Sequence, residues 1–172
     1  MSQLKVNSII PIAGAPSGGG GGIVQVVHAS FSTETAIAST TFTNTGLTAS
    51  ITPSSSSNKI LVIVSQNLQF SRSNTSAHGG MKVIRLVSGG SDVSIYEAQA
   101  TSNPTLGIQV NAHGSGIIAR MNACVNIEDS PNTTSLIAYR VQAAANTISD
   151  NGKVTAQEED TPSHITLMEI AA

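Results

Sequence analysis

The chain has 172 residues, of which 40% are hydrophobic and only 10% are charged, and its formal net charge at pH 7 is −2. This length allows one packed domain with a short appendage. The charge excludes broad nucleic-acid binding, because a run of phosphates requires clustered Lys and Arg. Average proteins carry roughly 25% charged residues, so the shortage favours a chain that places much of its surface against other subunits. A secreted β-domain with a neutral polar surface is the alternative.

Three properties limit the cellular context. Cys124 is the single cysteine, so no intrachain disulfide forms and no oxidising compartment is required. The first ten residues lack the continuous apolar region of a signal peptide. No stretch is long enough to cross a bilayer as a helix. We therefore expect synthesis and assembly in a cytosol, without membrane insertion.

Residues 1–22 differ from the rest of the chain. A short extended-looking segment ends at a proline and is followed by five consecutive glycines at 18–22. Because a glycine run is too flexible for a helix or strand, we predict a hinged arm that docks on a partner. Its docking residues are Leu4, Val6, Ile9 and Ile10. The alternative is a disordered tail.

Residues 23–172 are predicted to form one β-domain. Segments rich in Val, Ile and Thr are separated by turn residues such as Pro, Gly, Asn and Ser. This spacing indicates an all-β sandwich or barrel, and no segment has the pattern of an amphipathic helix. The predicted strands are 23–30, 35–42, 47–52, 59–70, 81–87, 93–99, 106–111, 116–127, 133–143 and 164–170.

Two of these segments indicate how their faces are covered. Residues 60–64 are apolar at every position, which predicts a central strand covered on both sides, and Gln66 then marks its approach to solvent or to a subunit seam. Residues 116–128 alternate instead, with apolar side chains on one face and mostly polar ones on the other. Arg120 projects from that polar face, and we predict that it lies at a subunit interface, paired with a carboxylate or carbonyl of the next chain. An ordinary surface arginine is the alternative. Cys124, on the same face, is expected to be a small buried filler.

The sequence contains no recognisable catalytic, cofactor or metal motif. Histidines are single and scattered, and a three-histidine metal site is a minor alternative. A glycan-cleaving enzyme requires two carboxylates that face one sugar bond, and two pairs close in sequence are the candidates. The acidic run 158–160 is expected to be an exposed loop. The histidines are His28, His78, His113 and His164, and the carboxylate pairs are Asp92 with Glu97 and Glu128 with Asp129.

Several phrases of the sequence are shared with a known group of proteins. They are LKVNSI at 4–9 before a glycine-rich joint, IVQVV at 23–27, TGLTASITPSSSSNKILV at 45–62 and SHITLMEI at 163–170. In these phrases the chain resembles short tail-fibre or knob proteins of cyanophages and related marine bacteriophages. The likeness covers both ends and the early core, whereas residues 72–111 have no counterpart.

The resemblance implies a structural virion protein with no enzymatic activity and no cofactor. Its C-terminal part would be a jelly-roll-like β-sandwich similar to tumour-necrosis-factor-like domains, assembled as a homotrimer in the host cytoplasm. The arm would bind another virion protein of the tail, baseplate or capsid, and distal loops would contact the host, with a surface glycan as a candidate receptor. A capsid decoration protein is the structural alternative, because the long repetitive shaft of most phage fibres is missing.

Overall fold

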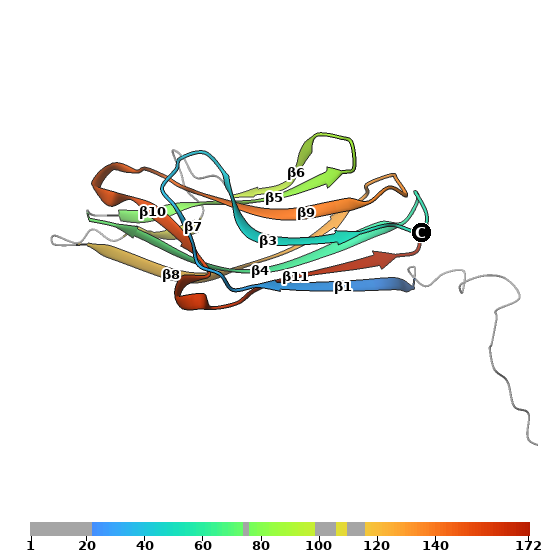
Figure 1. Ribbon diagram of the computed structural model, residues 1–172, viewed down its shortest axis with the longest axis horizontal. Coiled ribbons are helices and arrows are strands. Elements are labelled where there is room, and N and C mark those ends of the chain that lie inside the picture. Colours follow the sequence, from blue (N-terminus) through green and yellow to red (C-terminus); the bar gives the residue numbers. More distant parts are fainter. Residues whose placement is uncertain (1–21, 74–75, 99–105, 110–115) are drawn as a thin grey trace, which may run out of the picture.

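The computed structural model describes residues 22–73, 76–98, 106–109 and 116–172, which form a sandwich of two antiparallel sheets (Figure 1). Sheet A has six strands and sheet B has five. The described chain also contains two short turns, η1 (Ser149–Asn151) and η2 (Glu158–Asp160). Sheet A contains β1 (Ile23–Phe31), β2 (Thr35–Ile37), β4 (Lys59–Arg72), β8 (Ile117–Asp129), β10 (Lys153–Ala156) and β11 (Ser163–Ile170). Sheet B contains β3 (Thr43–Ile51), β5 (Ser76–Val87), β6 (Asp92–Ala98), β7 (Leu106–Gln109) and β9 (Ile137–Ala145).

Strands that are distant in the sequence pair in a nested order. β1 pairs with β11, β3 with β9, β4 with β8, and β5 with β6. This nesting arises when one long hairpin folds over on itself and sends alternate strand pairs to opposite sheets, which produces the double Greek key of a jelly roll. Along the first half of β4, sheet A follows the order β1-β11-β4-β8. Along the second half of β4, β10 pairs with β4 in place of β11, and β2 pairs with β10. The predicted all-β, jelly-roll-like sandwich is confirmed.

The core lies between the two sheets and is built from alternate residues of each strand. On β4, Ile60, Val62 and Val64 are at most 1% exposed, whereas the residues between them are half-buried. Tyr139 and Val141 of β9 face them from sheet B and are fully buried. Burying each of these aliphatic side chains contributes roughly 1.5–3 kcal/mol. The β-branched residues pack closely in the extended backbone, which explains how a chain without Trp fills its core.

A polar cluster interrupts the core halfway along β4. Gln66 has no exposed surface, and its amide oxygen accepts a hydrogen bond of 3.1 Å from the Thr45 hydroxyl. Its amide nitrogen donates to Ser163 Oγ at 2.9 Å. The prediction that Gln66 approaches solvent is therefore wrong, because side chains from β3 and β11 supply the hydrogen bonds that a buried amide needs.

A register shift in β3 brings the two sheets close to each other. The shift lies between Asn44 and Thr48, and Gly46 within it has a φ of +91°. A Cβ atom at Gly46 would overlap the ring of Phe31, which comes from β1 of sheet A. Only glycine combines this backbone conformation with such a close approach.

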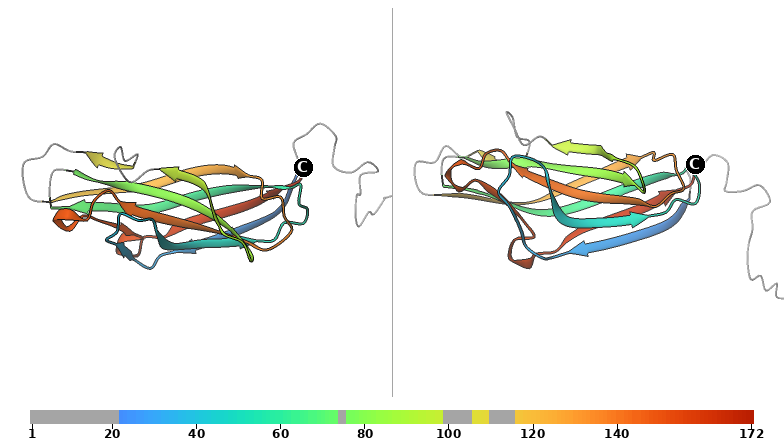
Figure 2. Two further views of the ribbon diagram at one scale, coloured as in Figure 1. Left: turned by 90° about the horizontal axis from the view of Figure 1, so that it is seen from above. Right: turned by 45° about the horizontal axis from the view of Figure 1, so that its top comes forward.

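The strands run along the length of the sandwich and separate two ends, as both views in Figure 2 show. At one end, the Ala171 amide donates to the Gly22 carbonyl at 3.0 Å, so residues 1–21 join the domain beside the C-terminus. At the opposite end, the Ser73 amide donates to the Asp150 carbonyl at 2.8 Å, which ties the turn after β4 to the β9–β10 connection. The domain thus has an arm-bearing end and a distal end.

The predicted strands differ from the observed ones chiefly in their bounds. Residues 35–42 yield only the three-residue β2, since the chain leaves the sheet after Ile37. Strand β10 was missed, because its four residues lie between turns and are too few to show an alternation. Strand β9 begins later than predicted, at Ile137 rather than at 133.

Candidate assembly surface

The outer face of sheet A is the most distinctive surface of the domain. On β4, Leu61 and Ile63 alternate with buried core residues and so point away from sheet B. They were expected to be covered on both sides, but no second layer of the described chain lies on this face, and both side chains are half-buried only. The surface consists of Ile23, Val26, His28 and Ser30 on β1, His164, Thr166, Met168 and Ile170 on β11, Lys59, Leu61, Ile63, Ser65 and Asn67 on β4, and the even-numbered residues 118–128 on β8.

Near the arm-bearing end, this outer face carries a row of apolar residues. Antiparallel register places Val26, Met168 and Leu61 side by side across three strands. The next row consists of His28, Thr166, Ile63 and Asn126. Val26 is 54% exposed, although its neighbours along the strand are more protected. On β8 this apolar row ends at Glu128. An exposed apolar row across three strands is typical of a protein–protein contact.

Charged groups on this surface occur at its margins and in pairs. Lys59 Nζ lies 2.5 Å from Glu128 Oε1 at the arm-bearing end. Toward the distal end, Arg120 Nη2 lies 3.5 Å from Glu158 Oε1, a residue of η2. Both pairs leave the middle of the surface free of charge, which lowers the desolvation cost of covering it.

Arg120 occupies the face that the alternation predicted. It is directly opposite Gln69 of β4, and its side chain is 57% exposed. Its carboxylate partner in the single chain is Glu158, whereas we had expected a partner from the next chain. Glu158 was interpreted as part of an exposed acidic loop, yet only 17% of its side chain is exposed, because η2 turns back toward β4. The interface role of Arg120 stays a prediction.

Cys124 also projects from this surface. It is exposed, and its Sγ lies 3.9 Å from Asn122 Oδ1. The expectation of a small buried filler is therefore wrong for the single chain, because β8 is an edge strand whose even-numbered side chains all point outward. Alternation predicted the face correctly, but it does not say whether a face is covered.

A buried carboxylate fixes the arm-bearing end, and sequence reasoning missed it. Glu169 has no exposed surface. It accepts hydrogen bonds from Gln25 Nε2 at 2.5 Å, from Ser54 N at 2.7 Å and from Asn58 Nδ2 at 2.6 Å. Burial alone would raise its pKa, but these donors stabilise the carboxylate and lower the pKa to about 2. A signal was present: Glu169 is in phase with the apolar residues Ile165 and Leu167 of β11.

A second buried polar group joins β8 to sheet B. Asp129 accepts a hydrogen bond of 2.7 Å from the Tyr139 hydroxyl, and Arg85 Nη1 lies 2.6 Å from its other oxygen. Burial and the bond to Asp129 raise the pKa of Tyr139, so the phenol stays protonated. Glu128, the preceding residue, is exposed on the opposite face, as the alternation predicted.

The carboxylates considered for sugar cleavage each have a cationic partner. Asp92 lies 2.6 Å from Arg140, and Glu97 lies 3.0 Å from Lys82. Asp129 pairs with Arg85 and Glu128 pairs with Lys59, as described above. These two carboxylates point to opposite faces of β8. Neither pair therefore presents two free oxygens to one bond, which glycoside hydrolysis requires. Among the described residues, no cluster of three metal-ligating side chains occurs, and no helix is long and apolar enough to span a membrane.

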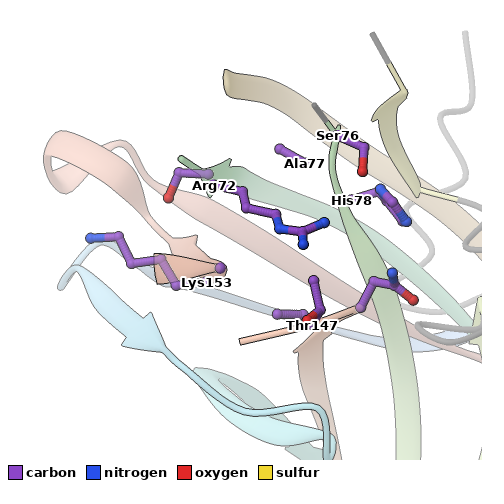
Figure 3. A pocket seen from close by; sticks show the side chains of 10 residues that line it. Arg72, Ser76, Ala77, His78, Thr147 and Lys153 are labelled. Atoms are coloured by element: carbon purple, nitrogen blue, oxygen red, sulfur yellow. The ribbon is translucent and has the colours of Figure 1, made fainter. Parts of the chain in front are cut away.

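A small cavity lies between the sheets at the distal end (Figure 3). Its volume is about 10 Å³, which is close to the space that one water molecule needs. Arg72 points into it and also pairs with Asp150 at 3.0 Å. Figure 3 places Ser76 and His78 together on the other side of β5, and no carboxylate lines the cavity. Its size and lining suit a bound water rather than a substrate.

The residues predicted to attach the arm, Leu4, Val6, Ile9 and Ile10, lie outside the described residues. The structure places the point where the arm joins, at Gly22 beside the C-terminal strand. The boundary between arm and domain at 22 and 23 stays a prediction.

Comparisons with known proteins give distant structural likenesses. No family model and no curated protein matches the chain. It is similar to a solved structure of infectious bursal disease virus, Gt strain, with 12% identity and a TM-score of 0.30, over 95% of this chain and 43% of that chain. For a solved structure of the Gx strain, the identity is 11% and the TM-score is 0.29, over 98% of this chain and 43% of that chain. For a mutant VP2 protein of that virus in derived T=1 particles, the identity is 11% and the TM-score is 0.26, over 87% of this chain and 37% of that chain. The chain thus spans less than half the length of these chains.

Proposed function

We propose that this chain is a structural protein of a bacteriophage particle, a homotrimeric tail fibre or knob that contributes to host attachment. The observation that carries the proposal is the outer face of sheet A, which is uncovered, carries an apolar row across three strands and has its ion pairs only at its margins. The sequence resemblance to short cyanophage fibre proteins supplies the virion context. No reaction is assigned to the chain.

The partner proposed for this surface is a second copy of the same chain. A foreign partner that binds by charge would need an uncompensated patch of one sign, whereas the marginal charges here form Lys59–Glu128 and Arg120–Glu158 pairs. Around a three-fold axis, three copies of this face can converge so that their apolar rows cover one another. The low charge of the whole chain supports the same partner.

The polarity of the domain supports the attachment role. Residues 1–21 join beside the C-terminus, and the connections around Ser73 and Asp150 lie at the other end (Figure 1). A trimer built on sheet A keeps the three arms together at the virus-facing end. The distal connections then face the host.

Host contact through ring stacking on a glycan finds little support. The five aromatic residues of the chain are buried or half-buried. Tyr139 and Phe70 lie within the core. A receptor at the distal end is therefore bound through neutral polar groups and loop backbone, with a protein or the polar edges of a glycan as candidates.

A capsid decoration protein is the second candidate. The glycine run at 18–22 leads directly into β1, so no repetitive shaft separates the arm from the jelly roll. A short trimer without a shaft also suits a shell surface. Antibody labelling of intact particles distinguishes the two positions, because a fibre is labelled at the tail and a decoration protein over the whole head.

Two matched valines test the assembly surface. Val26 is 54% exposed on this surface, and Val93 is 43% exposed on β6 of sheet B. We expect Val26→Asp to abolish the trimer at micromolar concentration, because three carboxylates would be buried without partners. Val93→Asp should leave the trimer intact. Sedimentation velocity of both variants decides the question, and a trimer unaffected by Val26→Asp contradicts the proposed surface.

A further inference from the structure

Two histidines lie against each other near the middle of the assembly surface. His28 of β1 and His164 of β11 are diagonal neighbours, because His28 is opposite Thr166 and His164 is opposite Ser30. Their ring centroids are 5.5 Å apart, and their planes differ by 23°. His28 Nδ1 lies 3.0 Å from the Thr166 hydroxyl, which holds the first ring in place.

The surroundings of this pair offer no charge compensation. Across β4 and β8, the two histidine rows continue into Ser65, Ile63, Cys124 and Asn126. His164 Nδ1 is buried and has no hydrogen-bond partner among the described residues. The ionisable groups on the surface and at its distal margin are Lys59 from β4, Arg120, Cys124 and Glu128 from β8, and Glu158 of η2, and the loop before β11 carries Glu159 and Asp160 near Glu34.

We infer that the His28–His164 pair makes the self-association of this chain sensitive to acid. The inference rests on the proposed function, since it requires that a second copy covers this surface. Neutral imidazoles can be covered by a second copy at little cost. Protonated imidazoles would instead place two adjacent cations per chain under that copy, and no carboxylate of the described residues forms an ion pair with them.

Proton linkage determines whether association strengthens or weakens as the pH falls. If assembly buries both imidazoles in their neutral form, the separated chains bind more protons than the assembled ones, so association weakens as the pH falls. Each histidine that must lose a proton on assembly adds up to about tenfold per pH unit to this weakening. A homotrimer contains three such pairs, so the dependence on pH is steep.

Sedimentation equilibrium of the full chain at pH 8.0 and pH 5.5 tests the inference. The variants are His28→Asn with His164→Asn, in which neutral amides replace both rings, and His78→Asn, which changes a histidine on sheet B. We expect the wild type and His78→Asn to associate at least tenfold more weakly at pH 5.5 than at pH 8.0. The double variant should associate equally at both pH values.

The results separate this inference from the proposed function. A wild-type trimer of equal strength at both pH values overturns the histidine inference and leaves the trimer standing. A double variant that weakens with acid as much as the wild type also overturns it. A chain that is monomeric at pH 8.0 contradicts the proposed assembly itself. Far-ultraviolet circular dichroism at pH 5.5 verifies that each variant stays folded during the measurement.

Discussion

The Arg120 guanidinium lies 3.5 Å from the Glu158 carboxylate of the same chain, and this ion pair closes the distal margin of the outer face of sheet A. Arg120 extends from β8 and Glu158 follows β10, and these two strands flank β4 on opposite sides. In the single chain the arginine is 57% exposed, so the pair adds little to folding. If a second copy covers the margin, as proposed, the same ion pair becomes desolvated and its electrostatic attraction gains importance.

Arg120→Ala is therefore expected to separate folding from assembly. The free energy of unfolding of the separated chain should change by less than about 0.5 kcal/mol. Assembly should weaken by about 2–5 kcal/mol, because Glu158 would be left buried and unpaired. Arg140→Ala is the matched control, since Arg140 also pairs with a carboxylate, that of Asp92, but lies on sheet B. A trimer whose association constant is unchanged in Arg120→Ala means that this residue is an ordinary surface arginine.

Deleting residues 1–22 tests the attachment arm. The jelly roll is complete from β1 onward, so the shortened chain should fold and assemble as the full chain does. It should be missing from purified phage particles, because Leu4, Val6, Ile9 and Ile10 are lost. Immunoblots of purified particles measure incorporation. Loss of folding would assign these residues to the core, and normal incorporation would place attachment elsewhere.

Glu169 predicts how stability depends on pH. Its pKa in the folded chain is about 2, below the ordinary value of 4.5, so its stabilising contribution is complete above about pH 5 and is lost as the pH falls toward 2. Glu169→Gln should lower the free energy of unfolding at pH 7 by about 1–3 kcal/mol, because the new amide nitrogen faces donors. Thermal unfolding between pH 7 and 2.5 measures the stability of the wild type and of the variant. The difference between wild type and variant should shrink with acid, and a constant difference would contradict the assignment.

Tyr139→Phe tests the buried link between β8 and sheet B. The substitution keeps the ring in the core and removes only the hydroxyl that donates to Asp129. One oxygen of a carboxylate that is 8% exposed then loses its partner. The expected destabilisation is about 1–3 kcal/mol in urea unfolding. Tyr96→Phe on β6 is the control and should stay within about 0.5 kcal/mol, because Tyr96 is only half-buried.

Sequence patterns predicted the fold well where one strand face is apolar throughout. In β8 the odd and even positions separate as the alternation indicated, and the burial of Ala119 and Ala123 follows from it. The same patterns failed where burial depends on partners distant in the chain. Glu169 is buried because Gln25, Ser54 and Asn58 converge on it, and a single segment cannot reveal this. For the same reason the covering of Leu61 and Ile63 was misjudged, since their pattern shows an apolar outer face but not which molecule covers it.

The oligomeric state of the purified full-length chain tests the central claim most directly. Native mass spectrometry and sedimentation velocity at pH 8 and micromolar concentration should show a homotrimer, because the outer face of sheet A carries an apolar row and is uncovered in the single chain. A well-folded monomer at that concentration would contradict the claim that this surface exists to join copies of the chain.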